Sequence, residues 1–299
     1  MTNKNRKSAI TNSVVRWYRR NAREFPWRRT RNPYRILLSE IMLQQTQASR
    51  VEIKYPKFLK RFSTLASLAR ANKSTVVRAW RGMGYNNRAV RLQELAQIVM
   101  REHGGRLPRT VEVLDALPGI GAYTAHAIAC FAFGQHVPAV DTNVRRILSR
   151  LYPKESKKLD VWEVARNVLP HRRAYDWNQA LFDLGAQVCT QRNPKCGICP
   201  VNRYCPSAYK VAQDRKTIAK RERGRNGIPD RIYRGRAVEI LRSLKNGKTI
   251  TAARLGKHIK VNYTNRDKSW LYRLLQTLER DGVVSLKNGS STLHVSLAK

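Results

Sequence analysis

Four of the five cysteines lie within one short segment, at a spacing that is typical of metal ligands. They are separated by six, two and five residues, at Cys189, Cys196, Cys199 and Cys205. Structural zinc sites usually present two short pairs of ligands, whereas this segment has one short pair and two longer gaps, which favours an iron–sulfur cluster. The remaining cysteine, Cys130, stands in an apolar segment and is expected to be a small core residue.

A glycine turn and a later aspartate form a second group of candidates. Gly119 and Gly121 separate an apolar helix end at residues 113–117 from an apolar helix that begins near Tyr123. Consecutive backbone N–H groups at a turn that opens a helix bind anions. Many such turns only connect helices, but here Asp141 stands at the start of another predicted helix about 20 residues later.

Glu40 is a third candidate, because its carboxyl group stands in a largely apolar segment, Leu38–Leu43. On its own, such a residue is most simply interpreted as an ion-paired or capping glutamate. From the residues alone, this is the preferred interpretation.

The composition is strongly basic, which indicates the class of partner. The chain of 299 residues has 59 Lys plus Arg against 20 Asp plus Glu, a formal net charge of +39 and a pI near 11.0. A surface this positive attracts polyanions, so nucleic acid is the expected partner and an anionic membrane is the alternative. No apolar run reaches the roughly 18 residues that span a bilayer, and the basic N-terminus lacks the apolar core of a secretory signal. We therefore expect a cytoplasmic protein, associated with the nucleoid if it is prokaryotic.

The candidates need a scaffold, and hydrophobic periodicity predicts that most of it is helical. Apolar residues recur at helical spacing from Ser13 to Leu148 and again from Val161 to Ala186, with frequent Gly and Pro stops. Residues 1–209 are therefore predicted to form a helical domain that carries the cysteine segment.

The rest of the chain is predicted to contain a basic linker, residues 210–230, and a small domain, residues 231–299. Ten Lys or Arg and three Asp or Glu give residues 210–236 a net charge of +7. Three helical patterns and two strand-like runs around Asn288-Gly289 follow, an order typical of a winged helix, whose third helix enters the major groove of DNA. A protein-docking domain with the same fold is the alternative. The basic residues expected on the polar side of the third helix are Arg266, Lys268 and Arg273.

Together these motifs resemble the helix-hairpin-helix superfamily of DNA glycosylases, in the branch of endonuclease III and the MutY-type adenine glycosylases. The Leu117–Gly121 hairpin, Asp141 and the cysteine spacing carry the match to the superfamily, and Pro26–Arg28 with Leu38–Thr46 look like the MutY type. The resemblance covers about two thirds of the chain. It implies a mainly α fold, a helix-hairpin-helix glycosylase with a 4Fe-4S cluster domain, to which a small α+β winged-helix-like C-terminal domain is added.

The resemblance also implies roles for individual residues. Glu40 would protonate the leaving adenine, and Asp141 would stabilise or briefly trap the cation at C1′ of the sugar. Tyr123 stands where endonuclease III carries a lysine for Schiff-base chemistry, and a tyrosine cannot form that imine. The other roles implied are orientation of the carboxyl groups by Tyr123 and Asn143, a base pocket of Trp27, Arg28 and Gln179, wedges into the duplex at Gln45 and Tyr85, and a phosphate contact at Gly119 and Gly121.

The implied function is that of a monofunctional DNA glycosylase of base-excision repair, which acts as a monomer on double-stranded DNA and removes adenine opposite 8-oxoguanine or guanine. The opposite base stays open, because a winged-helix-like pattern stands where the MutY type usually carries an 8-oxoguanine-recognition domain. The alternative enzyme is a thymine or uracil glycosylase for T·G mismatches, while Tyr123 argues against a bifunctional lyase. The alternative of another class is a non-catalytic, redox-sensing DNA-binding regulator, against which the presence of both Glu40 and Asp141 argues.

Overall fold

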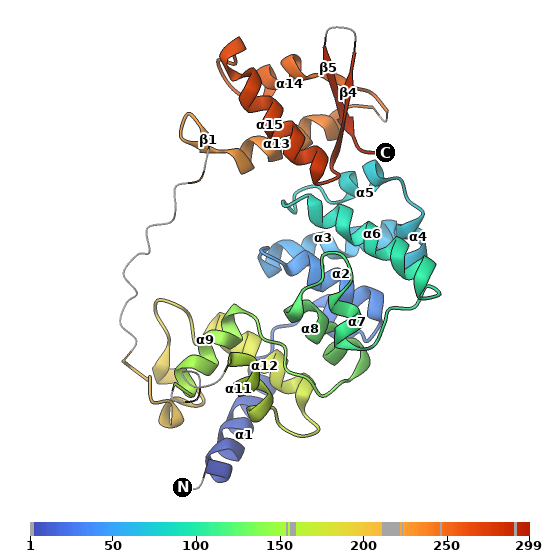
Figure 1. Ribbon diagram of the computed structural model, residues 1–299. Helices are drawn as coiled ribbons and strands as arrows, with labels where there is room; N and C mark the ends of the chain where they lie inside the picture. Colours follow the sequence, from blue (N-terminus) through green and yellow to red (C-terminus); the bar gives the residue numbers. More distant parts are fainter. Residues whose placement is uncertain are drawn as a thin grey trace. The chain divides into compact units, whose positions relative to one another are not determined.

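The chain divides into two compact units, each assembled from distant segments. The computed structural model describes residues 3–153, 155, 160–210, 222, 224–245, 247–289 and 292–299 (Figure 1). Within these ranges no helix is long and apolar enough to cross a membrane. The first unit comprises Met1–Glu40, Pro108–Ala116 and Ile120–Ile218, and the second comprises Ile41–Leu107, Leu117–Gly119 and Ala219–Lys299.

The first unit is helical, and its core forms around α12, which packs against α1 and α9. Trp177 of α12 and Leu37 of α2 are almost completely buried there. Two helices of this unit begin at an aspartate whose side chain accepts a backbone N–H group, Asp141 before α9 and Asp160 before α11. The elements are α1 (Asn3–Asn21), η1 (Pro26–Arg29), α2 (Pro33–Leu43, which continues into the second unit), α7 (Val111–Asp115), α8 (Ala122–Phe133), α9 (Thr142–Leu151), α11 (Val161–Val168), α12 (Ala174–Gln187), η2 (Cys196–Ile198) and η3 (Asn202–Tyr204).

The second unit begins with a group of helices in which α4 and α5 both pack on α6. Trp80, at the end of α5, is fully buried, and its ring meets that of Phe58 edge-on at 5.7 Å between centroids. The elements are α3 (Ala48–Arg61), α4 (Leu65–Ala69), α5 (Lys73–Ala79) and α6 (Asn87–Glu102).

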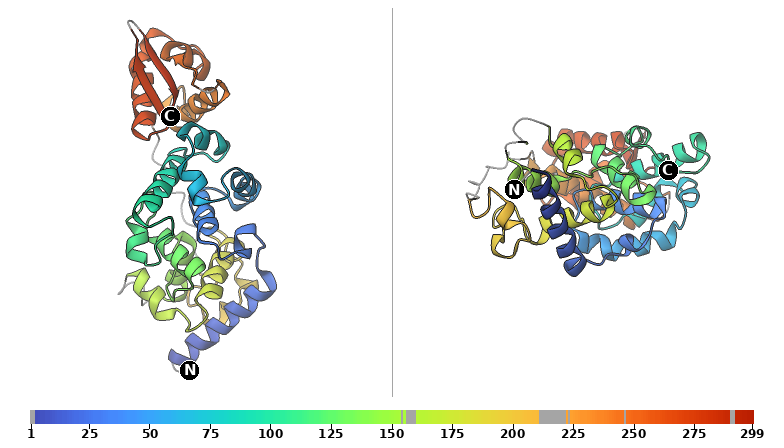
Figure 2. Two further views of the ribbon diagram at one scale, coloured as in Figure 1. Left: turned by 90° about the vertical axis from the view of Figure 1, so that its right-hand side faces the viewer. Right: turned by 90° about the horizontal axis from the view of Figure 1, so that it is seen from below.

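The C-terminal module, residues 224–299, completes the second unit with helices and small sheets. In the three-stranded sheet β5 lies between β3 and β4, and both pairings are antiparallel. The β4–β5 hairpin packs beside α15 (Figure 2), and the order helix, strand, two helices and hairpin is winged-helix-like. The elements are β1 (Gly224–Arg225), β2 (Ile228–Pro229), α13 (Asp230–Ser243), β3 (Ile250–Thr251), α14 (Ala252–Ile259), η4 (Asn265–Asp267), α15 (Lys268–Arg280), β4 (Val284–Asn288) and β5 (Leu293–Leu297).

The mainly helical fold predicted from the sequence is confirmed, and two details of the C-terminal module differ from the prediction. Strand β3 was not predicted, because two residues are too few to show an alternating pattern. Arg266 lies in the 3-10 turn η4 rather than on the third helix. A capping box between Thr264 and Asp267 stabilises this turn, which precedes the helix in the chain. Lys268 does begin α15, and Arg273 is exposed on it.

The predicted linker, residues 210–230, lies largely outside the described residues, as does Ser290 in the predicted hairpin turn. The described end of the linker segment forms the short β1–β2 pair, whose turn holds Asn226 and Gly227 at positive φ. The division of the chain at residues 210–230 stays a prediction. Within the compact units, residues 41–107 group with the C-terminal module.

Candidate active site

Two elements of the first unit bring Glu40 and Tyr123 together. Glu40 lies near the end of α2 with 5% of its surface exposed, and Tyr123 lies in the first turn of α8. The Tyr123 hydroxyl donates a hydrogen bond to Glu40 Oε2 at 2.9 Å. Burial raises the pKa of Glu40 to about 7; the hydrogen bond from Tyr123 opposes this shift, and the charge of Asp141 adds to it. This carboxyl group can therefore hold a proton near neutral pH.

Asp141 supplies the second carboxyl group of the site. It caps α9, and its side chain accepts hydrogen bonds from the backbone N of Val144 at 2.7 Å and from Asn143 Nδ2 at 2.9 Å. Burial raises the pKa of Asp141, while these donors and the charge of Arg146 act in the opposite direction. The positive end of the helix dipole also favours the ionised form. The two carboxyl groups thus have different surroundings, one with a single hydroxyl donor and the other with several donors at a helix start.

Arg146 and Gly185 position Asn143, and neither was singled out in the sequence. Arg146 Nη2 donates to Asn143 Oδ1 at 2.8 Å and to the carbonyl of Gly185 at 2.9 Å, and its Nε donates to the carbonyl of Cys189 at 2.9 Å. A Cβ at position 185 would lie 2.6 Å from that of Asn143, so α9 and α12 approach closely because residue 185 is glycine. A glycine within a helical pattern is the sequence signal that could have indicated this close approach.

Arg28 is engaged in a buried ion-pair network. Its Nη1 and Nη2 donate to the two carboxylate oxygens of Asp183 at 2.7 and 2.9 Å, and Arg23 Nε donates to the same carboxylate at 2.7 Å. Asp183 is fully buried, and its hydrogen bonds with these arginines hold its pKa below the ordinary value against the effect of burial. Arg28 thus has a structural contact that the sequence did not reveal, and its predicted contact with the base stays a prediction.

We predict that Asp183→Asn destabilises the protein by about 3 to 5 kcal/mol, because it leaves Arg23 and Arg28 without the carboxylate that neutralises them. Thermal and urea unfolding monitored by circular dichroism measure the change. Asp176→Asn, on the same helix, is the matched control and should stay within about 1 kcal/mol of the wild-type protein. Equal stability of the two variants would contradict the importance of this network.

The remaining residues assigned to the base pocket are buried in the first unit. Trp27 is stacked on Phe25, with ring centroids 4.7 Å apart and planes 8° from parallel. Gln179 lies on α12 with 6% of its surface exposed. Their contact with adenine stays a prediction.

The two predicted wedge residues share an uncommon backbone conformation in the second unit. Gln45 has φ 53° and Tyr85 has φ 42°, and both side chains are exposed. Non-glycine residues adopt positive φ at some cost, and they do so most often where function requires it. Buried Arg88 holds both turns, because its guanidinium donates to the carbonyls of Gln44 and, at 3.0 Å, Met83. Sequence reasoning missed Arg88.

The two glycines of the turn, Gly119 and Gly121, have different surroundings. Gly119 has φ 79°, and a Cβ there would lie 3.1 Å from the Cβ of Arg91, so the chain itself requires a glycine. Gly121 precedes α8 in an extended conformation with open space where a Cβ would be. The chain itself therefore leaves room for a side chain at position 121, and this open space is where the predicted DNA phosphate would approach. Both phosphate contacts stay predictions.

The four cysteines of the segment line one cavity in the first unit, which also includes Arg150. Arg150 Nη1 lies 3.4 Å from the Sγ of Cys189, and the backbone N of Tyr209 lies 3.5 Å from the Sγ of Cys196. Burial raises the pKa of Cys199 to about 11, so thiolates require compensating positive charge, which a metal supplies. In the described ranges, no group of three His, Cys, Asp or Glu side chains is placed to hold a single metal ion. The shared cavity and the donor set fit a cluster.

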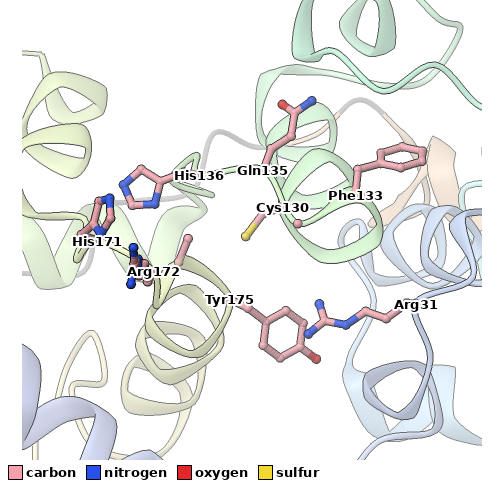
Figure 3. Close-up of a pocket in the computed structure, with 10 residues that line it drawn as sticks. Arg31, Cys130, Phe133, Gln135, His136, His171, Arg172 and Tyr175 are labelled. Atoms are coloured by element: carbon pink, nitrogen blue, oxygen red, sulfur yellow. The ribbon is translucent and has the colours of Figure 1, made fainter.

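A further cavity, of about 430 Å³, lies between the end of α8 and the start of α12 and contains none of the predicted site residues. Figure 3 shows Arg31 beside Tyr175 on one side and His136 beside His171 on the other. The guanidinium of Arg31 lies 3.8 Å from the centre of the Tyr175 ring. Since Tyr123 lies at the opposite end of α8, this cavity is distinct from the candidate active site.

Comparisons with known proteins define the class. Residues 38–169 match the HhH-GPD superfamily of base excision DNA repair proteins, and residues 189–205 match the iron-sulfur binding domain of endonuclease III. The solved structure of a thermostable thymine-DNA glycosylase has a TM-score of 0.66 and 33% sequence identity, covering 70% of this chain and 99% of that chain. The fold is thus that of a helix-hairpin-helix DNA glycosylase with an iron–sulfur domain.

Relatives identify the branch. The adenine DNA glycosylase of Mycobacterium tuberculosis (strain H37Rv) is 38% identical over 281 residues, which cover 91% of this chain and 89% of the relative. The thymine/uracil-DNA glycosylase of Methanothermobacter thermautotrophicus is 35% identical over 210 residues, which cover 68% of this chain and 95% of the relative. The chain belongs to the HhH-GPD superfamily of base excision DNA repair proteins, in the branch of the adenine DNA glycosylases. The family, the fold class and the 4Fe-4S cluster predicted from the sequence are confirmed.

We predict that the purified protein is yellow-brown and contains iron and acid-labile sulfide in equal amounts, because the four cysteine thiolates hold a 4Fe-4S cluster. Colorimetric iron and sulfide assays check this result. Stoichiometric zinc without iron would contradict it. Cys130→Ala is the control and should keep the full cluster content, since Cys130 is buried beside Asn178 rather than in the cysteine cavity.

Proposed function

We propose that this protein is a monofunctional DNA glycosylase that removes adenine mispaired with 8-oxoguanine or guanine in base-excision repair. The observation that carries the proposal is the pair of carboxyl groups, Glu40 with a pKa near 7 and Asp141 at a helix start. Cleavage of a glycosidic bond requires a protonated leaving group and a stabilised cation, and such a pair meets both needs. The similarity to adenine DNA glycosylases over most of the chain supports adenine as the base.

In the proposed mechanism, protonated Glu40 gives its proton to the ring of the adenine, at N7. The bond between C1′ and the base then breaks, and its electron pair stays with the neutral adenine. Ionised Asp141 stabilises the positive sugar, or forms a transient bond to C1′, until water adds there and releases a proton. The products are free adenine and an abasic site in an uncut strand.

Positioning residues hold the two carboxyl groups in place. Tyr123 donates to one oxygen of Glu40 and leaves the other for the base. Asn143, itself held by Arg146, donates to Asp141 and so orients it toward the sugar. Tyrosine at position 123 cannot form an imine with the abasic sugar, so strand cleavage should not follow base release. When bound, the cluster cross-links the loop that follows α12.

Duplex DNA is a polyanion that the net charge of +39 attracts. An enzyme of this function works where the chromosome lies, in the cytoplasm or nucleoid. Flipping a base out of the duplex leaves a gap, which Gln45 and Tyr85 would fill. Gly119 and Gly121 would hold a phosphate nearby.

The test is a panel of duplexes that contain A·8-oxoG, A·G, T·G or U·G, incubated with excess enzyme and then treated with alkali to cut abasic sites. The proposal predicts cleavage at adenine in the first two duplexes. A thymine or uracil glycosylase, favoured by the relative from Methanothermobacter thermautotrophicus, would cut the last two instead. A DNA-binding regulator would cut none of them.

A further inference from the structure

A buried arginine joins the C-terminal module to the turn that carries Tyr85. Arg242, on α13, donates to the carbonyl of Val77 from Nε at 3.0 Å and from Nη2 at 2.8 Å. The same Nη2 donates to Asn86 Oδ1 at 2.8 Å, and only 4% of the Arg242 side chain is exposed. Asn86 directly follows Tyr85, so α13 fixes the end of this turn.

Further contacts within the second unit reinforce this junction. Arg78 Nη2 donates to the carbonyl of Leu244 at 2.9 Å, and Arg81 forms an ion pair with Glu239 at 2.8 Å. Val77 and Val90 belong to the same buried hydrophobic cluster as the helices of the C-terminal module. The module is therefore packed against α5 and α6 and does not depend on the linker alone for its position.

A basic groove lies at the junction. It is a cavity of about 410 Å³ between the Gly84–Asn87 turn and α13. Its charged lining residues are Arg50, Arg231, Arg234 and Asp281, so positive charge predominates. Tyr85 stands on its wall with 52% of its surface exposed. The planar guanidinium group of arginine can donate two parallel hydrogen bonds to a phosphate. Contacts to phosphates fix the register of a protein on DNA.

We propose that this groove binds the sugar–phosphate backbone of the DNA beside the mismatch, and that Arg242 and Asn86 position the Tyr85 turn for that contact. The C-terminal module then takes part in recognising the mismatch, in addition to any contact that α15 makes. This inference rests on the proposed function in one respect, namely that the DNA substrate is a mismatched duplex.

The groove is tested in the full chain with a double variant in which Arg231 and Arg234 are both replaced by glutamine. In the control variant, Arg254 and Lys257 of α14 are both replaced by glutamine. These two residues are exposed on the same module, and their replacement removes the same amount of charge. Affinity is measured over a salt series for a duplex that carries an uncleavable abasic-site analogue opposite guanine. Each phosphate contact contributes about 0.9 to the magnitude of the slope of log affinity against log salt. The magnitude of this slope should therefore fall by about 2 in the groove variant and by clearly less in the control variant. Equal losses in both variants, or none in the groove variant, would overturn the proposal.

The exposed ion pair between Arg231 and Glu222, 2.7 Å long, does not prevent this contact, because exposed pairs are weak and a phosphate can replace the carboxylate. Glu222→Gln should therefore leave the salt slope unchanged or slightly strengthen binding. A loss of affinity equal to that of the groove variant would mean that the pair itself, rather than phosphate binding, supports the groove.

The positioning role of Asn86 is tested with two variants. Asn86→Asp keeps an acceptor for Arg242, whereas Asn86→Leu removes it. We expect Asn86→Leu to lower the preference for the abasic-analogue duplex over matched duplex by about tenfold, the factor for one hydrogen bond to a charged group, and Asn86→Asp to retain the preference. A purely structural role would lower the melting temperature of Asn86→Leu without changing the preference, and that result would overturn this part of the proposal.

These binding measurements do not depend on base release. If the wild-type protein releases no adenine but the groove variant still shows the reduced slope of log affinity against log salt, the proposed function is wrong and the proposed role of the groove is supported. If adenine is released and the salt slope of the groove variant is unchanged, the groove fails and the proposed function stands.

Discussion

Asp141→Asn is expected to lower the rate of adenine release by at least about 100-fold while duplex binding stays near the wild-type level. Asparagine is as good a helix N-cap as aspartate, so α9 should keep its start and the hydrogen bond from Val144. What the substitution removes is the negative charge that stabilises the cation at C1′. Contacts to DNA phosphates are unaffected, because they come from other residues. Single-turnover excision and equilibrium binding to an A·8-oxoG duplex measure the two quantities.

Asp160→Asn is the matched control for this prediction. Asp160 caps α11 in the same unit, with a hydrogen bond from the backbone N of Trp162 at 3.0 Å. Both substitutions therefore make the same chemical change at a helix start, and only Asp141→Asn should affect excision. An undiminished rate for Asp141→Asn would show that another residue stabilises the cation.

Glu40→Gln is expected to lower adenine excision by about 10² to 10⁴-fold, because an amide has the shape of the carboxyl group but cannot give up a proton to the base. The pH dependence provides a second signature. With a pKa of about 7, Glu40 loses its proton as pH rises through neutrality, so the wild-type rate should fall above pH 7. The residual rate of Glu40→Gln should lack this decrease. Full adenine activity in the variant would mean that Glu40 is not the acid.

The same pKa shift predicts an effect of Glu40 on stability. Its pKa is raised from 4.5 to about 7 on folding, so between these values the folded state holds a proton that the unfolded state has lost. The free energy of unfolding should therefore decrease as pH rises from about 4.5 to 7, by up to about 3 kcal/mol. Glu40→Gln should lack this decrease and be more stable than wild type at pH 8. Glu112→Gln, an exposed glutamate of α7, is the control and should follow the wild-type pH profile.

The parts of the site that the sequence predicts are those encoded locally. Four cysteines within 17 residues must share a neighbourhood, and they line one cavity. Asp141 precedes an apolar helical pattern, and it caps α9. Such features depend on short spacing and helix signals, which a single sequence displays.

The supports of the site could not be predicted, because each joins residues that are distant in the chain. Asp183 pairs with Arg28 across 155 positions, and Arg242 reaches Asn86 across 156. Neither pair leaves a periodic or motif signal, since a buried partner is recognisable only once the fold brings the two together. The same reason explains why the packing of the C-terminal module on Val77 and Val90 was not expected from a sequence that separates them with a basic segment.

Direct detection of the released base is the most direct test of adenine excision by this protein. An A·8-oxoG duplex is incubated with excess enzyme, and free bases are quantified by mass spectrometry while the strands are resolved without alkali. We expect one free adenine per duplex and an intact strand that breaks only after alkali. Absence of free adenine, release of thymine from a T·G duplex in its place, or strand breakage without alkali would contradict it.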